Sequence, residues 1–424
     1  MAKPAGINAI DIGSGKITCL ITIPSGEEGD KINLVGAATV PSRGINKGQV
    51  VNIEEAVGAI SNCVESAERM AGFNIQEAYV SINGDHIQSQ NSQGLVAITE
   101  SEREINQDDI FRVIEAARAI SLPTAREIIH VLPREFIVDT QRGIKDPTGM
   151  SGVRLETEAH MITGLSPAIR NVTRCVSDLG INVSGLVYAG LASSESVLTD
   201  TEKELGVVLV DIGAGTTSIS VFIEGACCFS AVIPVGARKV TDDIAIGLTS
   251  SIDTAERIKH FLSKPKATNE GEKSQDEIDF EKLGIREDHL KTGSRKSIVE
   301  GIVRPRLNEI FSLVRDILKK SGYEDQTPAG IVLTGGGSMT AGALESCRRV
   351  LQLPPRLGIP SGLSGIVDEV SSPIYSAAVG LVLYGYKQKP QNTAGGAKLH
   401  GIFKKVPGRE VAGKALEFIK SFLP

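Results

Sequence analysis

Apolar residues recur along this chain at two spacings, which predict helices and strands in alternation. Apolar stripes spaced by three and four residues predict helices over 54–70, 108–120 and 302–320. Short apolar runs predict strands over 78–82, 207–210 and 330–334. Because helices alternate with strands, the pattern predicts an α/β fold built in layers.

Two segments of the chain resemble each other, 200 positions apart. In each, the sequence Asp-Ile-Gly-x-Gly follows one short apolar run and precedes another, within residues 9–21 and 210–223. Strand, glycine turn and strand predict a hairpin with an acid at its mouth. The long offset between the copies indicates duplicated domains rather than a solenoid of short repeats.

The two glycine turns are candidate sites for phosphate. Backbone N–H groups recognise phosphate oxygens, and glycine lets the backbone approach without a Cβ in the way. A neighbouring carboxylate can hold Mg²⁺, usually through water, so Asp11 and Asp211 are the candidate metal-binding residues. The candidate cofactor-binding residues are Asp11, Gly13, Ser14, Gly15 and Lys16 in the first turn, and Asp211, Gly213, Ala214, Gly215, Thr216 and Thr217 in the second.

One copy of this motif is also typical of an ordinary hairpin, but two copies at matched positions favour a shared polyphosphate. Ile10 and Ile17 exclude a P-loop, and Thr18 excludes a dinucleotide-binding fingerprint. A third candidate, Gly335-Gly336-Gly337-Ser338, lies between a predicted strand and a helix-like segment. Its glycines allow a bulky group to approach closely, although a loop without a ligand explains them equally well.

Composition narrows the class of protein. With 424 residues and 41% hydrophobic content, the chain can form more than one core, and we expect two to four domains. Trp is absent, aromatic residues make up 4% and the net charge is −6, which argues against a nucleic-acid binder. The scattered cysteines and histidines indicate a reducing cytoplasm and no structural zinc, and no apolar run is long enough to span a membrane.

The C-terminal segment is basic. Residues 387–424 contain eight Lys/Arg and two Glu, a net charge of +6 against −12 for the rest of the chain. Residues 387–410 are aperiodic and predict a linker. Over 411–424 one helical face carries Ala412, Ala415, Leu416, Phe418, Ile419, Phe422 and Leu423, with Lys414 and Lys420 mostly away from it. This pattern predicts a helix lying in an anionic membrane surface, although a helix docked on the protein's own body would look the same.

Two regions are predicted insertions. Residues 85–163 contain their own strand and helix signals and are expected to form a small α+β subdomain. Residues 263–297 carry eight acids and eight bases in 35 positions, so we expect a solvated loop without regular packing.

The motifs together resemble a known superfamily. Two acid–glycine turns followed by Thr334-Gly335-Gly336-Gly337-Ser338 are similar to the arrangement in the actin, Hsp70 and sugar-kinase ATPases. The segment 130–163 narrows the resemblance, with His130-Val131-Leu132-Pro133, Phe136-Ile137-Val138-Asp139, Gly143-Ile144-Lys145-Asp146-Pro147, Gly149-Met150-Ser151-Gly152, Arg154-Leu155-Glu156 and His160. Over nearly all of 7–386 the chain resembles the FtsA family of bacterial actin-like cell-division proteins.

This resemblance implies an actin/Hsp70-like α/β fold with two lobes around a cleft for ATP and Mg²⁺. Gly335–Gly337 and Ser338 would face the adenosine. Glu256 and Lys259 would lie near the ribose and adenine, although a solvated helix pair explains their spacing as well. The implied parts are lobe 1 (1–84 plus 164–198), the inserted subdomain (85–163), the lobe 2 core (199–230 plus 298–386), its outer subdomain (231–297), the linker (387–410) and the membrane helix (411–424).

The resemblance also implies a function. Such a protein polymerises and tethers the ring of the tubulin-like protein FtsZ to the inner face of the cytoplasmic membrane at the division site. Its expected partners are the FtsZ C-terminal peptide, other copies of itself, other division proteins and the anionic membrane surface. ATP hydrolysis is expected to be slow at most, and no catalytic residue is assigned. The alternatives are a related actin-like scaffold of a pilus or secretion machine, against which 130–163 argues, and a small-molecule kinase.

Overall fold

The computed structural model describes residues 6–24, 32–98, 104–264, 276–285, 287 and 290–388. The chain divides into two compact units, Met1–Tyr384 and Gly385–Pro424. Of the second unit, only the last turn of helix α11 (Ser376–Gln388) is described. The predicted linker beyond Gln388 and the predicted membrane helix 411–424 therefore lie outside the described residues.

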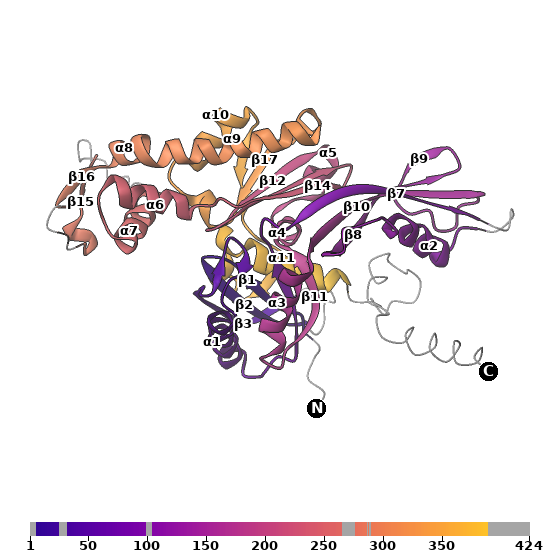
Figure 1. Ribbon diagram of the computed structural model, residues 1–424, viewed down its shortest axis with the longest axis horizontal. Coiled ribbons are helices and arrows are strands. Elements are labelled where there is room, and N and C mark those ends of the chain that lie inside the picture. The colour runs from indigo at the N-terminus through magenta and orange to yellow at the C-terminus, as the bar shows by residue number, and fades with distance from the viewer. Residues whose placement is uncertain are drawn as a thin grey trace. The chain divides into compact units, whose positions relative to one another are not determined.

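The first lobe contains a six-stranded sheet in the order β11-β6-β1-β2-β3-β19. Its strands are β1 (Asn8–Ile12), β2 (Lys16–Pro24), β3 (Ile32–Pro41), β6 (Glu77–Ile82), β11 (Asn182–Tyr188) and β19 (Leu363–Gly365). β1, β2 and β3 are antiparallel, whereas β6 runs parallel to both β1 and β11. Helix α1 (Ile53–Ala71) packs on β2 and β3, and α3 (Ser166–Ser177) packs on β11 and α1, which buries one apolar core. Figure 1 shows β1, β2 and β3 of this sheet near helix α1.

The second lobe repeats this topology in the order β14-β13-β12-β17-β18. Its strands are β12 (Val207–Ile212), β13 (Thr217–Ile223), β14 (Ala226–Ile233), β17 (Ile331–Thr334) and β18 (Pro355–Leu357). Three antiparallel strands again precede two parallel ones, so β12 corresponds to β1 and β17 to β6. Helix α9 (Arg304–Ser321) packs on α10 (Ala343–Leu351) and β14. Both predicted hairpins are therefore present, in two lobes of matching topology.

The inserted segment forms a four-stranded antiparallel sheet in the order β7-β10-β8-β9. Its elements are β7 (Gln88–Ala97), α2 (Gln107–Arg118), β8 (Arg126–Val138), β9 (Gln141–Ile144) and β10 (Arg154–Leu165). Helix α2 covers one face, where a Cβ on Gly94 would lie 2.1 Å from the Val113 carbonyl oxygen. The other face meets β14, and Ser89 Oγ donates to the Ser230 carbonyl oxygen at 2.6 Å. The subdomain thus contacts the second lobe although it is inserted in the chain of the first.

The charged region after residue 262 is packed where the structure describes it, so the prediction of a loop without packing is wrong there. This outer part contains α6 (Arg238–Gly247), α7 (Ile252–Ser263), β15 (Glu277–Asp279), η1 (Glu281–Leu283), β16 (Thr292–Ser294), α8 (Arg295–Ile298) and the π-helical η2 (Val299–Val303). Ile278, Phe280 and Leu290 are buried in the core of the second lobe. These few apolar residues lie between charges without a regular period, so pattern analysis misses them.

Helix α11 packs closely against helix α4. Helix α4 (Ala189–Val197) contacts strands of both lobes, and the short α5 (Asp200–Leu205) follows it. A Cβ on Gly380 of α11 would lie 1.7 Å from the Ala192 carbonyl oxygen, so only glycine fits this approach. Within the described part of the chain, no helix is long and apolar enough to cross a membrane.

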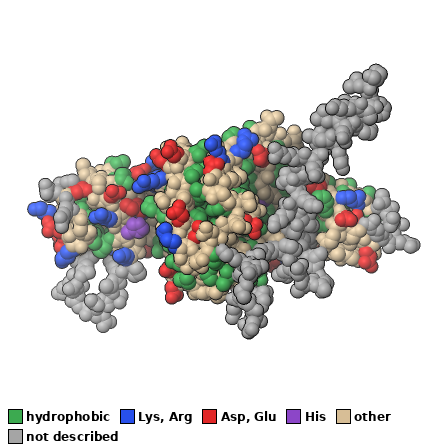
Figure 2. Space-filling model, turned by 90° about the horizontal axis from the view of Figure 1, so that it is seen from below, with side chains coloured by type: hydrophobic (Ala, Val, Ile, Leu, Met, Phe, Trp, Pro, Cys, Tyr) green, Lys and Arg blue, Asp and Glu red, His purple; other side chains and the backbone are tan. Residues whose placement is uncertain are grey.

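The surface mixes charges of both signs. Figure 2 shows Lys and Arg side chains interspersed with Asp and Glu on the face in view. Exposed side chains of opposite sign form ion pairs in the described part of the chain, such as Lys145 Nζ with Glu204 Oε2 at 2.6 Å. Exposed pairs of this kind typically contribute about 0–1 kcal/mol each, so the buried cores of the two lobes supply most of the stability.

Candidate functional site

The two glycine turns have the same local geometry. Gly13 N donates to the Lys16 carbonyl oxygen at 3.0 Å, and Gly213 N donates to that of Thr216 at 2.8 Å. The acids are also equivalent, because Asp11 pairs with Thr18 in the first hairpin and Asp211 with Ser218 in the second. The sequence repeat is therefore a repeat of one turn, with one carboxylate at the end of each inner strand.

The turns lie directly against each other. A Cβ on Gly15 would be 2.7 Å from Ala214 Cβ, and one on Gly215 would be 2.8 Å from Ser14 Oγ. Arg238 Nη2, at the start of α6, donates to the Ser14 carbonyl oxygen at 3.2 Å. Residues 200 positions apart in sequence thus form one site, and glycine is required where they approach.

A small hairpin of β4 (Ile45–Asn46) and β5 (Gln49–Val50) covers the first turn. Gly48 N donates to Ser14 Oγ at 2.7 Å. Asn83, immediately after β6, donates from Nδ2 to Thr216 Oγ1 at 3.2 Å and to Ser218 Oγ at 2.9 Å. These hydrogen bonds connect both turns to elements of the first lobe.

The two carboxylates lie in a desolvated setting. Burial raises the pKa of Asp11, although the neighbouring Lys16 charge and a hydrogen bond from Ser81 oppose the shift. Burial raises the pKa of Asp211 to about 6, a hydrogen bond from Ser193 opposes the shift, and the charge of Asp11 adds to it. Ser193 Oγ of α4 donates to Asp211 Oδ2 at 2.6 Å. Because the negative charges of the two carboxylates repel each other, a cation bound between them is favoured.

Lys16 supplies the cation nearest to these acids. Its Nζ is buried, has no hydrogen-bond partner among the described residues, and lies 3.8 Å from the centre of the Tyr375 ring. Burial lowers the pKa of Lys16 to about 8, while the charges of Asp11 and Asp211 oppose the shift. The side chain is therefore mostly charged at pH 7 and still has donors to offer.

The third glycine segment reaches the second acid. A Cβ on Gly335, whose φ is +79°, would lie 2.2 Å from Asp211 Oδ1. Ser338, in the short helix η4 (Gly336–Met339), donates from Oγ to the Gly335 carbonyl oxygen at 2.7 Å. Gly335 N donates to the carbonyl oxygen of Pro373 in η6 (Pro373–Tyr375) at 3.1 Å. The third candidate segment thus belongs to the same site, next to Tyr375.

Glu256 and Lys259 form a helix pair on α7. Lys259 Nζ donates to Glu256 Oε2 at 2.7 Å and to Thr241 Oγ1 at 2.8 Å. Thr241 lies on α6, which is bonded to the second turn because Ala237 N donates to the Gly213 carbonyl oxygen at 2.9 Å. The pair therefore links α7 to the helix that leaves the site, and its role toward a ligand stays a prediction.

Among the second-turn residues, Thr217 is hydrogen-bonded within its own lobe. It is fully buried in β13, and its Oγ1 donates to the Val235 carbonyl oxygen at 2.8 Å. No group of three or more His, Cys, Asp or Glu able to hold a metal occurs among the described residues. Two carboxylates, Asp11 and Asp211, are enough for Mg²⁺, because this ion keeps several of its waters and takes one or two carboxylates.

Sequence reasoning missed four residues at the site: Asn83, Ser193, Arg238 and Tyr375. Asn83 had a usable signal, since it follows a predicted strand whose end lies beside Asp11 once β6 pairs in parallel with β1. The other three come from helices or turns far along the chain, and no local pattern indicates them. They reach the site only through tertiary packing.

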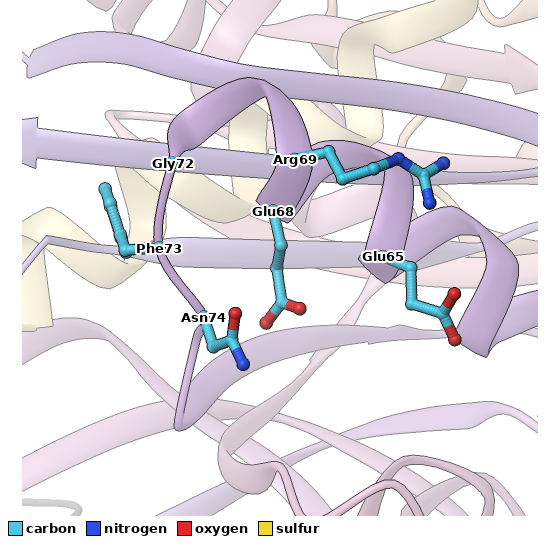
Figure 3. A pocket seen from close by; sticks show the side chains of 6 residues that line it. All are labelled: Glu65, Glu68, Arg69, Gly72, Phe73 and Asn74. Carbon is cyan, nitrogen blue, oxygen red and sulfur yellow. The ribbon is translucent and has the colours of Figure 1, made fainter.

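A separate surface pocket of about 390 Å³ lies at the end of α1 (Figure 3). It is lined by Glu65, Glu68, Arg69, Gly72, Phe73 and Asn74, none of which belongs to the predicted site. Glu68 Oε1 accepts a hydrogen bond from Ile75 N at 2.7 Å, so this carboxylate stabilises the chain where it leaves the helix. The last helical turn ends at Gly72 with φ +78°, as expected for a left-handed C-cap.

Solved structures resemble this fold at low sequence identity. A PilM–PilN type IV pilus biogenesis complex has a TM-score of 0.61 at 15% identity, covering 90% of this chain and 98% of that chain. MreB5 of Spiroplasma citri bound to ADP has a TM-score of 0.52 at 13% identity, covering 91% and 98%. These likenesses concern the fold alone, and they confirm the predicted α/β fold of actin-like ATPases.

Family models and relatives identify the chain more closely. The model described as the SHS2 domain inserted in FtsA matches residues 84–163, and the model described as cell division protein FtsA matches 208–380. The cell division protein FtsA of Pseudomonas aeruginosa is 43% identical over 385 residues, which is 90% of each chain. That of Borreliella burgdorferi is 38% identical over 420 residues, which is 98% of each. This chain therefore belongs to the FtsA family of cell-division proteins.

Proposed function

We propose that this protein binds ATP with Mg²⁺ where its two glycine turns meet. The observation that carries the proposal is the direct contact of two equivalent turns, each with its own acid, beside a third glycine segment. Structures of MreB5 from Spiroplasma citri, which share the fold, are described as bound to ADP and to AMPPNP. That nucleotide chemistry supports the same ligand class here.

Different residues of the site bind different parts of the nucleotide. Backbone N–H groups of Ser14–Lys16 and Ala214–Thr216 face phosphate oxygens, and the Lys16 ammonium offers donors that no described residue accepts. Asp11 and Asp211 hold the hydrated Mg²⁺, which supplies positive charge to the phosphates. Gly335–Ser338 receive the adenosine, since this segment lies against Asp211 and Ile212 and so beside the second turn. Because the turns touch each other, they must separate slightly to admit a phosphate.

We further propose that the ATP-bound protein polymerises and tethers the FtsZ ring to the inner face of the cytoplasmic membrane. Membership of a cell-division family supports this role, as does the basic C-terminal segment with its apolar helical stripe. ATP would set the angle between the lobes and so permit contacts between successive subunits. The FtsZ C-terminal peptide is the proposed partner, together with other division proteins.

A single C-terminal helix should bind membranes weakly. It is short and has two alanines on its apolar face, and each base near an anionic surface contributes about 1 kcal/mol. Several helices linked in one polymer would bind firmly, because after the first contact the others act at high effective concentration. Polymerisation and membrane attachment thus support each other.

Electron microscopy on a lipid monolayer tests this function. Monolayers containing anionic lipid, with protein and ATP, should carry filaments, and protein lacking 411–424 should leave them bare. Leu416→Asp should also abolish attachment, whereas Ser421→Ala, on the polar side of the helix, should not. Equal attachment by the truncated protein would contradict the membrane role.

The partner is tested separately with the FtsZ C-terminal peptide on beads. We expect the protein to be retained by this peptide and not by a scrambled peptide of the same composition. Equal retention by both peptides would contradict the proposed binding of the FtsZ C-terminal peptide.

A further inference from the structure

The environment of the Lys16 ammonium is unusual for a buried cation. Nζ is shielded from solvent and has no hydrogen-bond acceptor among the described residues, although it can donate three hydrogen bonds. A buried charge without hydrogen bonds is costly, so other interactions must stabilise this position. They are the Tyr375 ring, at 3.8 Å from Nζ to the ring centre, and the nearby charges of Asp11 and Asp211.

Tyr375 connects this lysine to two other parts of the site. It ends η6, whose Pro373 accepts a hydrogen bond from Gly335 N of the third glycine segment at 3.1 Å. The next residue, Ser376, begins α11 and its Oγ lies 2.6 Å from Thr334 Oγ1 at the end of β17. The segment that carries Tyr375 is therefore hydrogen-bonded to the third glycine segment and to the end of β17.

We propose that Lys16 exchanges partners when nucleotide binds: its ammonium leaves the face of Tyr375 and donates to phosphate, which frees the ring. The exchange rests on the proposed nucleotide function and adds a regulatory step to the same site. In it, Tyr375 competes with phosphate for the lysine, and its ring occupies the ammonium while no phosphate is present.

The strengths of the two interactions favour the exchange. A charge-assisted hydrogen bond from ammonium to phosphate is directional and strong in a desolvated site, whereas attraction to a tyrosine ring is weaker. Lysine carries its charge on a flexible four-carbon stem, so the ammonium can move from ring to phosphate by side-chain rotation once the turns have separated. The exchange also removes the penalty of unused donors on a buried ammonium.

The absence of tryptophan makes this exchange measurable. Tyr375→Trp creates a protein with a single tryptophan at the position of the ring, and its emission responds to the departure of a cation from its face. MgATP should change the emission of this variant, whereas adenosine, which has no phosphate, should not. In Lys16→Met combined with Tyr375→Trp, MgATP should cause little change. An equal response to adenosine would mean that the ring senses the base, which overturns the exchange.

The sign of an affinity change gives a second test, which does not depend on the tryptophan variant. Tyr375→Leu removes the competing partner of Lys16, so calorimetry should show MgATP binding about 2- to 30-fold more tightly. Tyr375→Phe keeps a ring and should stay close to the wild type. Weaker binding by Tyr375→Leu, in a variant whose thermal unfolding matches that of the wild type, would show that the ring itself holds nucleotide and would overturn the proposal.

The outcomes separate this inference from the function on which it rests. Wild-type protein that binds no MgATP would refute the nucleotide function, and the exchange with it. Binding by the wild type together with a silent tryptophan would refute the exchange alone. Binding together with a phosphate-specific response that requires Lys16 is the result that we expect.

Discussion

A buried histidine in the inserted subdomain should make the folded protein sensitive to mild acid. His130 lies on β8 and is 6% exposed, and its Nε2 accepts a hydrogen bond from Tyr188 N at 3.0 Å. Because that partner is an N–H donor, Nε2 must be unprotonated, and the ring proton lies on Nδ1, 3.4 Å from Tyr384 Oη. If Nε2 were protonated, its N–H would face the N–H of Tyr188, and neither donor would have an acceptor in this buried position.

The size of the effect follows from the pKa. Burial lowers the pKa of His130 from 6.5 to about 3. Below pH 6.5 the unfolded chain binds a proton that the folded protein refuses, so stability falls as the pH drops from 6.5 toward 3. Each pH unit in this window costs about 1.4 kcal/mol, so at about pH 5 the loss from this residue is about 2 kcal/mol.

Urea unfolding of the wild type and of His130→Gln, followed by circular dichroism, measures this term. Glutamine keeps an acceptor for Tyr188 N but does not titrate, so the variant should be less sensitive to acid. Between about pH 7.5 and about pH 5 the wild type should lose about 2 kcal/mol more than the variant. An equal loss in both proteins would refute the reasoning.

Three further outcomes are expected. Gly215→Val would place a Cβ 2.8 Å from Ser14 Oγ, so calorimetry should show MgATP affinity lowered by about tenfold or more. Gly58→Ala, where an added Cβ meets nothing within 4 Å on α1, should raise the free energy of unfolding by about 0.5–1 kcal/mol in urea titrations. As the pH falls through about 6, the Asp211 carboxyl, with its raised pKa, takes up a proton and can no longer hold Mg²⁺. Calorimetry with and without Mg²⁺ should therefore show that the affinity gained from Mg²⁺ shrinks, and a constant gain would contradict this.

The parts of the fold with local signals could be predicted from the sequence. The hairpins at Asp11 and Asp211 were predictable because strand, glycine turn and strand leave a short periodic pattern, and their repetition indicated the duplication. The direct contact of the turns follows from that duplication, although its closeness, with Gly15 against Ala214, is a tertiary result. Which helix carries Ser193 to Asp211 depends on the packing of α4 between strands of both lobes, which no window of sequence reports.

The charged region shows the opposite case. Its acids and bases outnumber its apolar residues, and composition alone therefore predicts a loop. Phe280 and Ile278 are nevertheless buried, because the second lobe supplies the apolar surface that this segment lacks. Residues 265–275 and the predicted C-terminal helix 411–424 lie outside the described residues, so those predictions await experiment.

The most direct test of the nucleotide site is calorimetry of MgATP with the wild type and with the double variant Asp11→Ala/Asp211→Ala. Asp316→Ala, whose carboxylate is 56% exposed on α9, is the matched control. The account predicts that the wild type and the control bind alike, and that the double variant binds at least about 100-fold more weakly, because two charged ligands of the metal are lost. Unchanged affinity in the double variant would contradict the placement of the nucleotide between the two turns.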